Sequence, residues 1–149
     1  MREIHLWVPG PPATAGSKTA FRTKTGKINV THANKKFRSW SYELKAAAQA
    51  EYKEAPCTCS VTLSVRVGLM RPNGHYGTGR NAGTLKASAP LEHTQRPDLC
   101  KIIRAVEDSL TGVIWRDDSQ INEYESCMKE WCSATFEQPG TAVTVKLWE

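Results

Sequence analysis

Residues 96–110 read RPDLCKIIRAVEDSL, and residues 115–121 read WRDDSQI. The apolar side chains of the first stretch recur at helical spacing and are Leu99, Ile102, Ile103, Val106 and Leu110. This stripe predicts an amphipathic helix from about Asp98 to Leu110 that buries one face. The second stretch predicts a turn that leads into a strand from about Gln120 to Ser133.

Acidic side chains accompany these two elements. Asp98 lies in the first turn of the predicted helix, where the helix dipole favours a negative charge. Asp117 and Asp118 begin the next strand, and we expect the short link over residues 111–114 to bring the two acidic ends together. Carboxylates gathered in this way suit a hard divalent cation, which organises phosphate chemistry. The alternative is that Asp98 only caps the helix and that Asp117 and Asp118 form a solvated turn.

Arg104 follows Cys100 by four residues, so the two side chains share one face of the predicted helix. A cation held by the carboxylates would polarise a phosphate and activate water. Arg104 would then neutralise the negative charge that develops on the phosphate.

The rest of the chain predicts one domain of the α+β class, spanning residues 1–149. We expect a mixed β-sheet with two helices packed on it, in the order β-α-β-α-β-β. The expected strands cover residues 4–8, 61–69, 120–133 and 143–147, the helices residues 34–53 and 98–110. Residues 13–32 predict a polar loop or loose hairpin, and the glycine-rich residues 71–96 a long, mobile loop.

Charge is distributed unevenly along the chain. Residues 1–96 hold 15 Lys/Arg against 5 Asp/Glu, and residues 97–149 hold 5 against 10, so +10 and −5 combine to the net +5. A basic surface favours a polyanionic partner such as nucleic acid, although an unevenly charged solvated surface is the alternative. The candidate phosphate contacts are Lys18, Arg22, Lys24, Lys27, Lys35, Lys36, Arg38, Arg71, Arg80, Arg96 and Lys101.

Neither a membrane-length apolar run nor a signal-peptide pattern is present in the sequence. The five cysteines are odd in number and lack zinc-site spacing, which favours reduced thiols over a disulfide framework. We therefore expect a cytoplasmic protein without a membrane partner.

The central motif resembles that of the RusA-type Holliday junction resolvases, small phage and prophage endonucleases. Their pattern is Pro-Asp-Leu-Asp followed by a helix with a basic residue, and then an aromatic residue before Asp-Asp-(Ser/Ala)-Gln. Residues 97–110 and 115–121 match this pattern except at Cys100. Residues 6–12, LWVPGPP, resemble the first strand and proline turn of the family, and the helix near Phe37 and the strand with Lys129 also fit.

The resemblance implies a homodimer that binds four-way DNA junctions and nicks two opposing strands symmetrically, using Mg²⁺. The metal-binding aspartates of the family fall on Asp98 and Asp118, with Asp117 beside them. Its third acidic ligand falls on Cys100, and its catalytic lysine falls on Arg104. If the chain is encoded by a phage, its expected location is the cytoplasm of the host cell.

Two departures from the family pattern affect the expected activity. Arginine keeps the positive charge of lysine but does not exchange a proton near neutral pH. A thiol is largely protonated at neutral pH and is a soft ligand, whereas Mg²⁺ prefers oxygen. We therefore expect this chain to bind junctions but to cleave poorly with Mg²⁺, with partial rescue by Mn²⁺.

Two other functions compete with this one. The first is a non-catalytic protein that binds DNA junctions on the same fold. The second is a small basic RNA- or DNA-binding module with an incidental Asp-Asp turn, which predicts no preference for branched DNA and no effect of Asp98→Asn or Asp118→Asn.

Overall fold

Alternating apolar residues build a four-stranded mixed sheet in the computed structural model, which describes residues 1–16, 18–32, 35–132 and 137–149. The strands are β1 (Arg2–Pro9), β4 (Ser60–Leu69), β5 (Ile121–Trp131) and β6 (Gly140–Trp148). Their order is β1-β6-β4-β5, with β6 antiparallel to β1 and β4, and β5 parallel to β4. The strand at one edge of the sheet is therefore β5, which follows the Asp117-Asp118 stretch in sequence.

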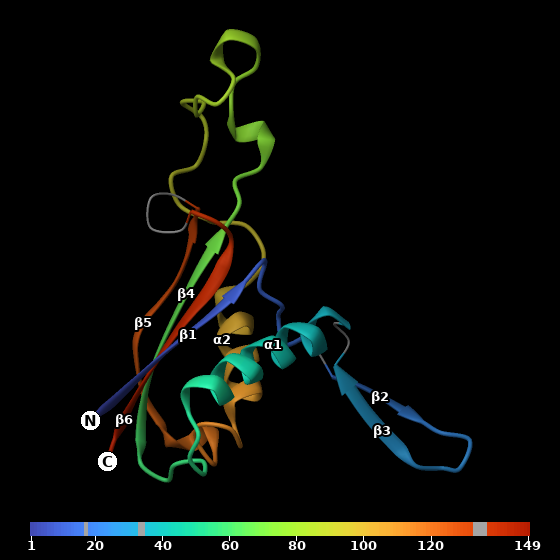
Figure 1. The fold of residues 1–149 in the computed structure, drawn as a ribbon. Helices are drawn as coiled ribbons and strands as arrows, with labels where there is room; N and C mark the ends of the chain where they lie inside the picture. The colour runs from blue at the N-terminus through green and yellow to red at the C-terminus, as the bar shows by residue number, and fades with distance from the viewer. Residues whose placement is uncertain (17, 33–34, 133–136) are drawn as a thin grey trace.

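Two helices cover one face of this sheet (Figure 1). Helix α1 (Lys35–Glu51) packs on β1, helix α2 (Leu99–Leu110) packs beside β5, and the two helices pack on each other. The buried side chains of the helices include Trp40, Leu44, Ile102, Val106 and Leu110, which meet the inward side chains of the strands. The prediction of an α+β fold with a mixed sheet and two packed helices is confirmed.

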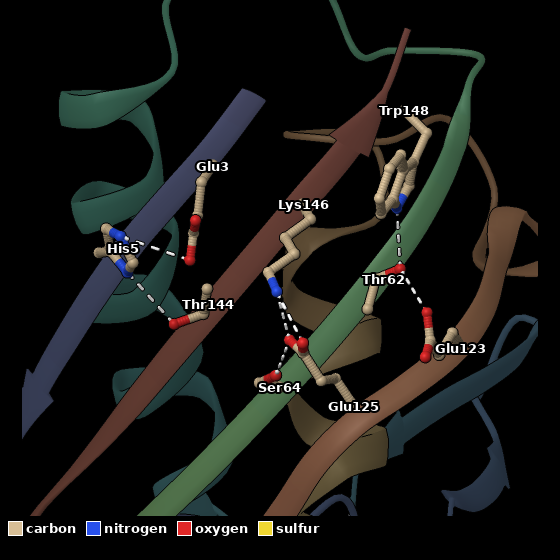
Figure 2. A network of polar contacts seen from close by, with 9 residues as sticks. All are labelled: Glu3, His5, Thr62, Ser64, Glu123, Glu125, Thr144, Lys146 and Trp148. Carbon is tan, nitrogen blue, oxygen red and sulfur yellow. Dashed lines mark hydrogen bonds and ion pairs between the residues drawn. The ribbon is translucent and has the colours of Figure 1, made fainter. Parts of the chain in front are cut away.

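The other face of the sheet carries polar and charged side chains (Figure 2). Lys146 pairs with Glu125 at 2.6 Å, and His5 lies 3.2 Å from the hydroxyl of Thr144. Trp148 donates to Thr62, which in turn donates to Glu123. This open face is rich in carboxylates, so it is a poor surface for DNA.

The predicted element order lacked a second sheet. Strands β2 (Lys18–Arg22) and β3 (Ile28–His32) form an antiparallel hairpin that projects from the body before α1 (Figure 1). The strands and α-helices therefore follow in the order β1, β2, β3, α1, β4, α2, β5 and β6. Phe21, Ile28 and Val30 are exposed, and no hairpin residue whose burial the structure describes is buried, so apolar alternation did not predict these strands.

Residues 71–96 extend beyond the sheet as an arm with two short 3₁₀ turns, η1 (Asn73–His75) and η2 (Gly79–Asn81) (Figure 1). Its base packs around Trp131: the ring of His93 lies 4.1 Å away and the guanidinium of Arg71 lies 5.1 Å away, measured to the ring centroid. Arg71 also donates to the carbonyl oxygens of Pro90 and Leu91. The base of the arm is therefore built from specific contacts.

The predicted boundaries differ from the observed ones by few residues. The first helix was expected to begin at Asn34 and the third strand to end at Ser133, and both residues lie outside the described part of the chain. None of the helices in the described ranges has the length and apolar character needed to cross a membrane.

Candidate active site at the two ends of helix α2

Asp98 stands at the N-terminal end of α2 without capping it. It occupies the N-cap position, but its side chain makes no capping hydrogen bond. Its carboxylate is exposed and lies 3.3 Å from the ammonium group of Lys101. Because the carboxylate is not used to satisfy the helix, it remains accessible at the surface.

Lys129 on β5 holds the segment that precedes Asp98. Its ammonium group donates hydrogen bonds to the carbonyl oxygens of Gln95 and, at 2.9 Å, of Pro97. These contacts place the start of α2 beside the later part of β5.

The outward stripe of α2 carries Cys100, Arg104 and Glu107, which recur at helical spacing. Cys100 and Arg104 are exposed, and Glu107 accepts a hydrogen bond from the hydroxyl of Tyr124 on β5. This hydrogen bond, together with burial and the negative charges of Glu107 and Asp118, raises the pKa of Tyr124 to about 12. Tyr124 therefore stays protonated, and its contact places the last turns of α2 beside the early part of β5.

The Asp117-Asp118 stretch forms a 3₁₀ turn, η3 (Asp118–Gln120), held in place by Gln120. The side-chain oxygen of Gln120 accepts from the backbone N–H of Arg116 and Asp117 at 3.0 and 2.9 Å. Its amide nitrogen donates to the carbonyl oxygens of Cys57 and Cys59 at 3.0 and 2.8 Å. The turn is therefore fastened to the segment that leads into β4.

The two aspartates of this turn are used differently. The hydroxyl of Ser119, and then its backbone N–H, which donates to Asp117 at 2.9 Å, hold the pKa of Asp117 below its usual value. Asp117 thus shapes the turn. Asp118 is exposed, and its negative charge contributes to the raised pKa of Tyr124. Asp118 is the better placed of the two to bind an ion.

The structure does not bring Asp98 and Asp118 together within one protomer. Pro97 lies beside Lys129, whereas Glu107 lies beside Tyr124, so α2 runs antiparallel to β5. The helical rise between Asp98 and Glu107 is about 14 Å. Across residues 1–16, 18–32, 35–132 and 137–149, no three His, Cys, Asp or Glu side chains gather where they could hold a metal ion. The expected convergence of the two acidic ends does not occur, because the helix separates them by its own length.

The predicted phosphate contacts occupy several surfaces. The exposed ones are Arg22, Lys24 and Lys27 on the hairpin, Lys35, Lys36 and Arg38 at the start of α1, Arg80 on the arm and Arg96 before α2. Arg71 is engaged at the base of the arm, and Lys101 is paired with Asp98. The side chain of Lys18 lies outside the described part of the structure.

Asp98 and Asp118 are exposed carboxylates, and the hairpin and the start of α1 carry exposed cations, which are groups that suit contact with a metal ion and with phosphates. The chain belongs to the RusA endodeoxyribonuclease family, whose model matches residues 9–146. Members of this family are divalent-metal-dependent endonucleases that act on Holliday junctions. No curated protein matches the chain.

Sequence reasoning gave no role in this region to Glu107 and Tyr124, and it cited Gln120 and Lys129 only as parts of the family resemblance. Glu107 could have been noticed, because it follows Cys100 by seven residues and Arg104 by three and so lies on the same face of the helix. The structural contacts of the other three include residues distant in sequence, which local spacing does not predict.

Proposed function

We propose that this chain is a Mg²⁺-dependent endonuclease that resolves four-way DNA junctions as a homodimer by two symmetric nicks. Family membership over residues 9–146 supports the substrate class. The observation that carries the assignment is the exposure of the four motif side chains, Asp98, Cys100, Arg104 and Asp118, along α2 and the turn after it. A structural motif would instead bury these groups in the core.

The basic projections supply the affinity for DNA in this proposal. Lysines and arginines on the hairpin and at the start of α1 contact phosphates, which gives strong binding without base specificity. The exposed guanidinium of Arg104 offsets negative charge on the phosphate under attack.

Cys100 weakens cleavage in this chain. It occupies a position where the family pattern has an aspartate, and the soft thiol is a poor partner for Mg²⁺. Because Cys100 is exposed, an aspartate at this position fits without repacking of the core. The chain is therefore expected to bind junctions well and cut them slowly.

The test is cleavage of a labelled four-way junction by the parent chain, Cys100→Asp and the matched control Cys100→Ser. We expect Cys100→Asp to raise the rate with Mg²⁺ at least tenfold, because it adds an oxygen ligand. Cys100→Ser removes the thiol without adding a carboxylate and should bring no gain, while Mn²⁺ should narrow the gap between parent and Cys100→Asp. Equal rates for all three chains would show that position 100 is no ligand.

A non-catalytic junction-binding protein is the second candidate, and Cys100 is the observation that favours it. In that case Cys100→Asp restores no cleavage, and Asp98→Asn and Asp118→Asn leave binding unchanged. A junction that binds no better than a duplex of the same length would contradict both candidates and support a general nucleic-acid-binding module.

A further inference from the structure

The arm over residues 71–96 ends in a tip that its own backbone closes (Figure 1). The backbone N–H of Lys86 donates to the carbonyl oxygen of His75 at 2.9 Å. Farther out, the backbone N–H of Gly77 donates to the carbonyl oxygen of Thr84, also at 2.9 Å. We call the segment from Gly77 to Thr84 the tip, and three further backbone hydrogen bonds form inside it. The tip therefore has a defined shape although it lies far from the core.

Glycines give the tip its narrow form. A Cβ atom added at Gly77 would lie 2.6 Å from the carbonyl oxygen of Asn81, so the two sides approach too closely for any larger residue there. Gly79 and Gly83 have φ angles of +60° and +82°, the left-handed region that favours glycine. Apart from Arg80, the other side chains of the tip are short. The tip is therefore little wider than its backbone.

Arg80 and Asn81 are the side chains that the tip presents. Both belong to the turn η2 and both are exposed. The whole arm holds four Lys or Arg residues against one carboxylate, that of Glu92, so its net charge is +3. A positively charged projection that carries one arginine at a narrow end suits a polyanion with a narrow groove.

The minor groove of DNA fits this tip better than the major groove does. The major groove is about 12 Å wide and is read by a helix or a β-ribbon that presents several side chains. The minor groove is about 6 Å wide, and its negative potential attracts inserted arginine. Arginine and asparagine are among the side chains that read it. The short neighbours of Arg80 allow the backbone of the tip to approach the mouth of such a groove.

The arm is also close to the candidate active site along the chain. It ends two residues before Asp98, and its base is fixed against Trp131 at the end of β5. DNA held at the start of α2 therefore has the arm beside it.

We infer that the arm inserts Arg80, with Asn81 beside it, into the minor groove of a duplex that flanks the cleavage point. The amino group of guanine projects into the minor groove, so this contact favours A·T over G·C pairs in that duplex. The arm thereby gives the protein a sequence preference that contacts to phosphates do not supply. This inference rests on the proposed function for DNA as the partner.

Inosine in place of guanine tests the groove. An inosine–cytosine pair lacks the minor-groove amino group of a G·C pair but keeps its major-groove acceptors. Fluorescence anisotropy measures binding to a G·C-rich four-way junction and to the same junction with inosine in its arms. We expect inosine to tighten binding by the parent chain about fivefold. Arg80→Ala should bind both junctions more weakly than the parent chain does, and about equally.

Matched variants make this result specific to the tip. Arg22→Ala removes a cation from the hairpin instead, so it should weaken binding to both junctions and keep the inosine effect. Gly77→Ala forces the tip apart at Asn81 and should reduce the effect. Gly74→Ala should keep the effect, because a Cβ atom at Gly74 meets no other atom within 4 Å.

The inference is overturned if inosine does not tighten binding by the parent chain, or if Arg80→Ala keeps the full effect. A third DNA, with 7-deazaguanine in place of guanine, removes an acceptor from the major groove only. If Arg80→Ala abolishes a response to this base instead, the arm reads the major groove and the inference is wrong.

The same comparison on a linear duplex separates this inference from the proposed function. A chain that binds the junction no better than the duplex refutes the proposed function. The inosine effect on the duplex, and its loss in Arg80→Ala, then still decide whether the arm reads the minor groove.

Discussion

At the scale of single residues, the base of the arm depends on a buried histidine. His93 is 8% exposed and packs against Trp131, with His75 and Arg71 around the same indole. Burial, and then the charge of Lys129, lower the pKa of His93. The folded protein therefore favours the neutral imidazole at this position.

The pH dependence of stability follows from this shift. In the unfolded chain a histidine titrates near pH 6.5, so above that pH His93 is neutral in both states. Below pH 6.5 the unfolded chain binds this proton more readily than the folded protein. The free energy of unfolding therefore falls with falling pH, until the pH is below the pKa of His93 in the folded protein. We expect the parent chain to lose more thermal stability than His93→Gln between pH 7.5 and pH 5, measured by calorimetry.

The matched control for this experiment is His5→Gln, which changes an exposed histidine on the open sheet face. Between pH 7.5 and pH 5, His5→Gln should lose as much thermal stability as the parent chain does. It should therefore also lose more than His93→Gln. Parallel curves for the parent chain and His93→Gln would show that His93 does not carry the effect.

At the scale of one element, the 3₁₀ turn that presents Asp118 depends on Gln120. Its side chain makes four hydrogen bonds to backbone groups of two separate segments. Asp117 and Gln120 also form a reciprocal capping box across the turn. The geometry of this turn is therefore set by a tertiary contact as much as by its own sequence.

Replacing Gln120 should loosen this turn. We expect Gln120→Ala to lower the free energy of unfolding by about 2 kcal/mol, because it leaves several backbone groups without partners. Gln120→Glu should also destabilise the fold, since a carboxylate would face the carbonyl oxygens of Cys57 and Cys59. Urea unfolding measures both variants, with Ser119→Ala as the comparison, because it removes only the hydroxyl contact of Ser119 with Asp117 and should cost less. Similar losses for Ser119→Ala and Gln120→Ala would contradict this account.

At the scale of the whole molecule, charge is separated between surfaces. The hairpin and the start of α1 carry exposed cations, whereas the open sheet face carries carboxylates (Figure 2). This separation predicts that DNA binds on the side of the hairpin and α1 rather than on the open face.

The salt dependence of junction binding tests this orientation. Lys35→Ala with Lys36→Ala removes two cations, so the slope of log K against log salt should become shallower by about 1.8. The matched control removes two other cations, Lys45 within α1 and Lys53 just after its end. This double variant should leave the slope nearly unchanged. Equal changes for the two double variants would place the DNA elsewhere. Fluorescence anisotropy at several salt concentrations gives both slopes.

Local sequence patterns were sufficient for most of the elements of this protein. The stripe of α2 and the alternation along β1, β4 and β6 reflect burial on one face, which a periodic sequence records directly. The hairpin was expected only as a loose alternative to a loop, because strands exposed on both faces carry no such alternation. The family motif likewise identified the exposed residues on α2 by their identity and spacing alone.

The distribution of the carboxylates was decided only by the tertiary structure. The short link after α2 suggested that the two acidic ends return to each other, but α2 lies antiparallel to β5 and holds them apart by its length. The edge position of β5 and the clamp by Gln120 likewise arise from contacts between distant segments. Sequence spacing measures separation along the chain, whereas a metal site requires its ligands to lie close together in space. Here the packing of α2 against β5 sets the spatial separation of the carboxylates, and the length of the link after α2 does not.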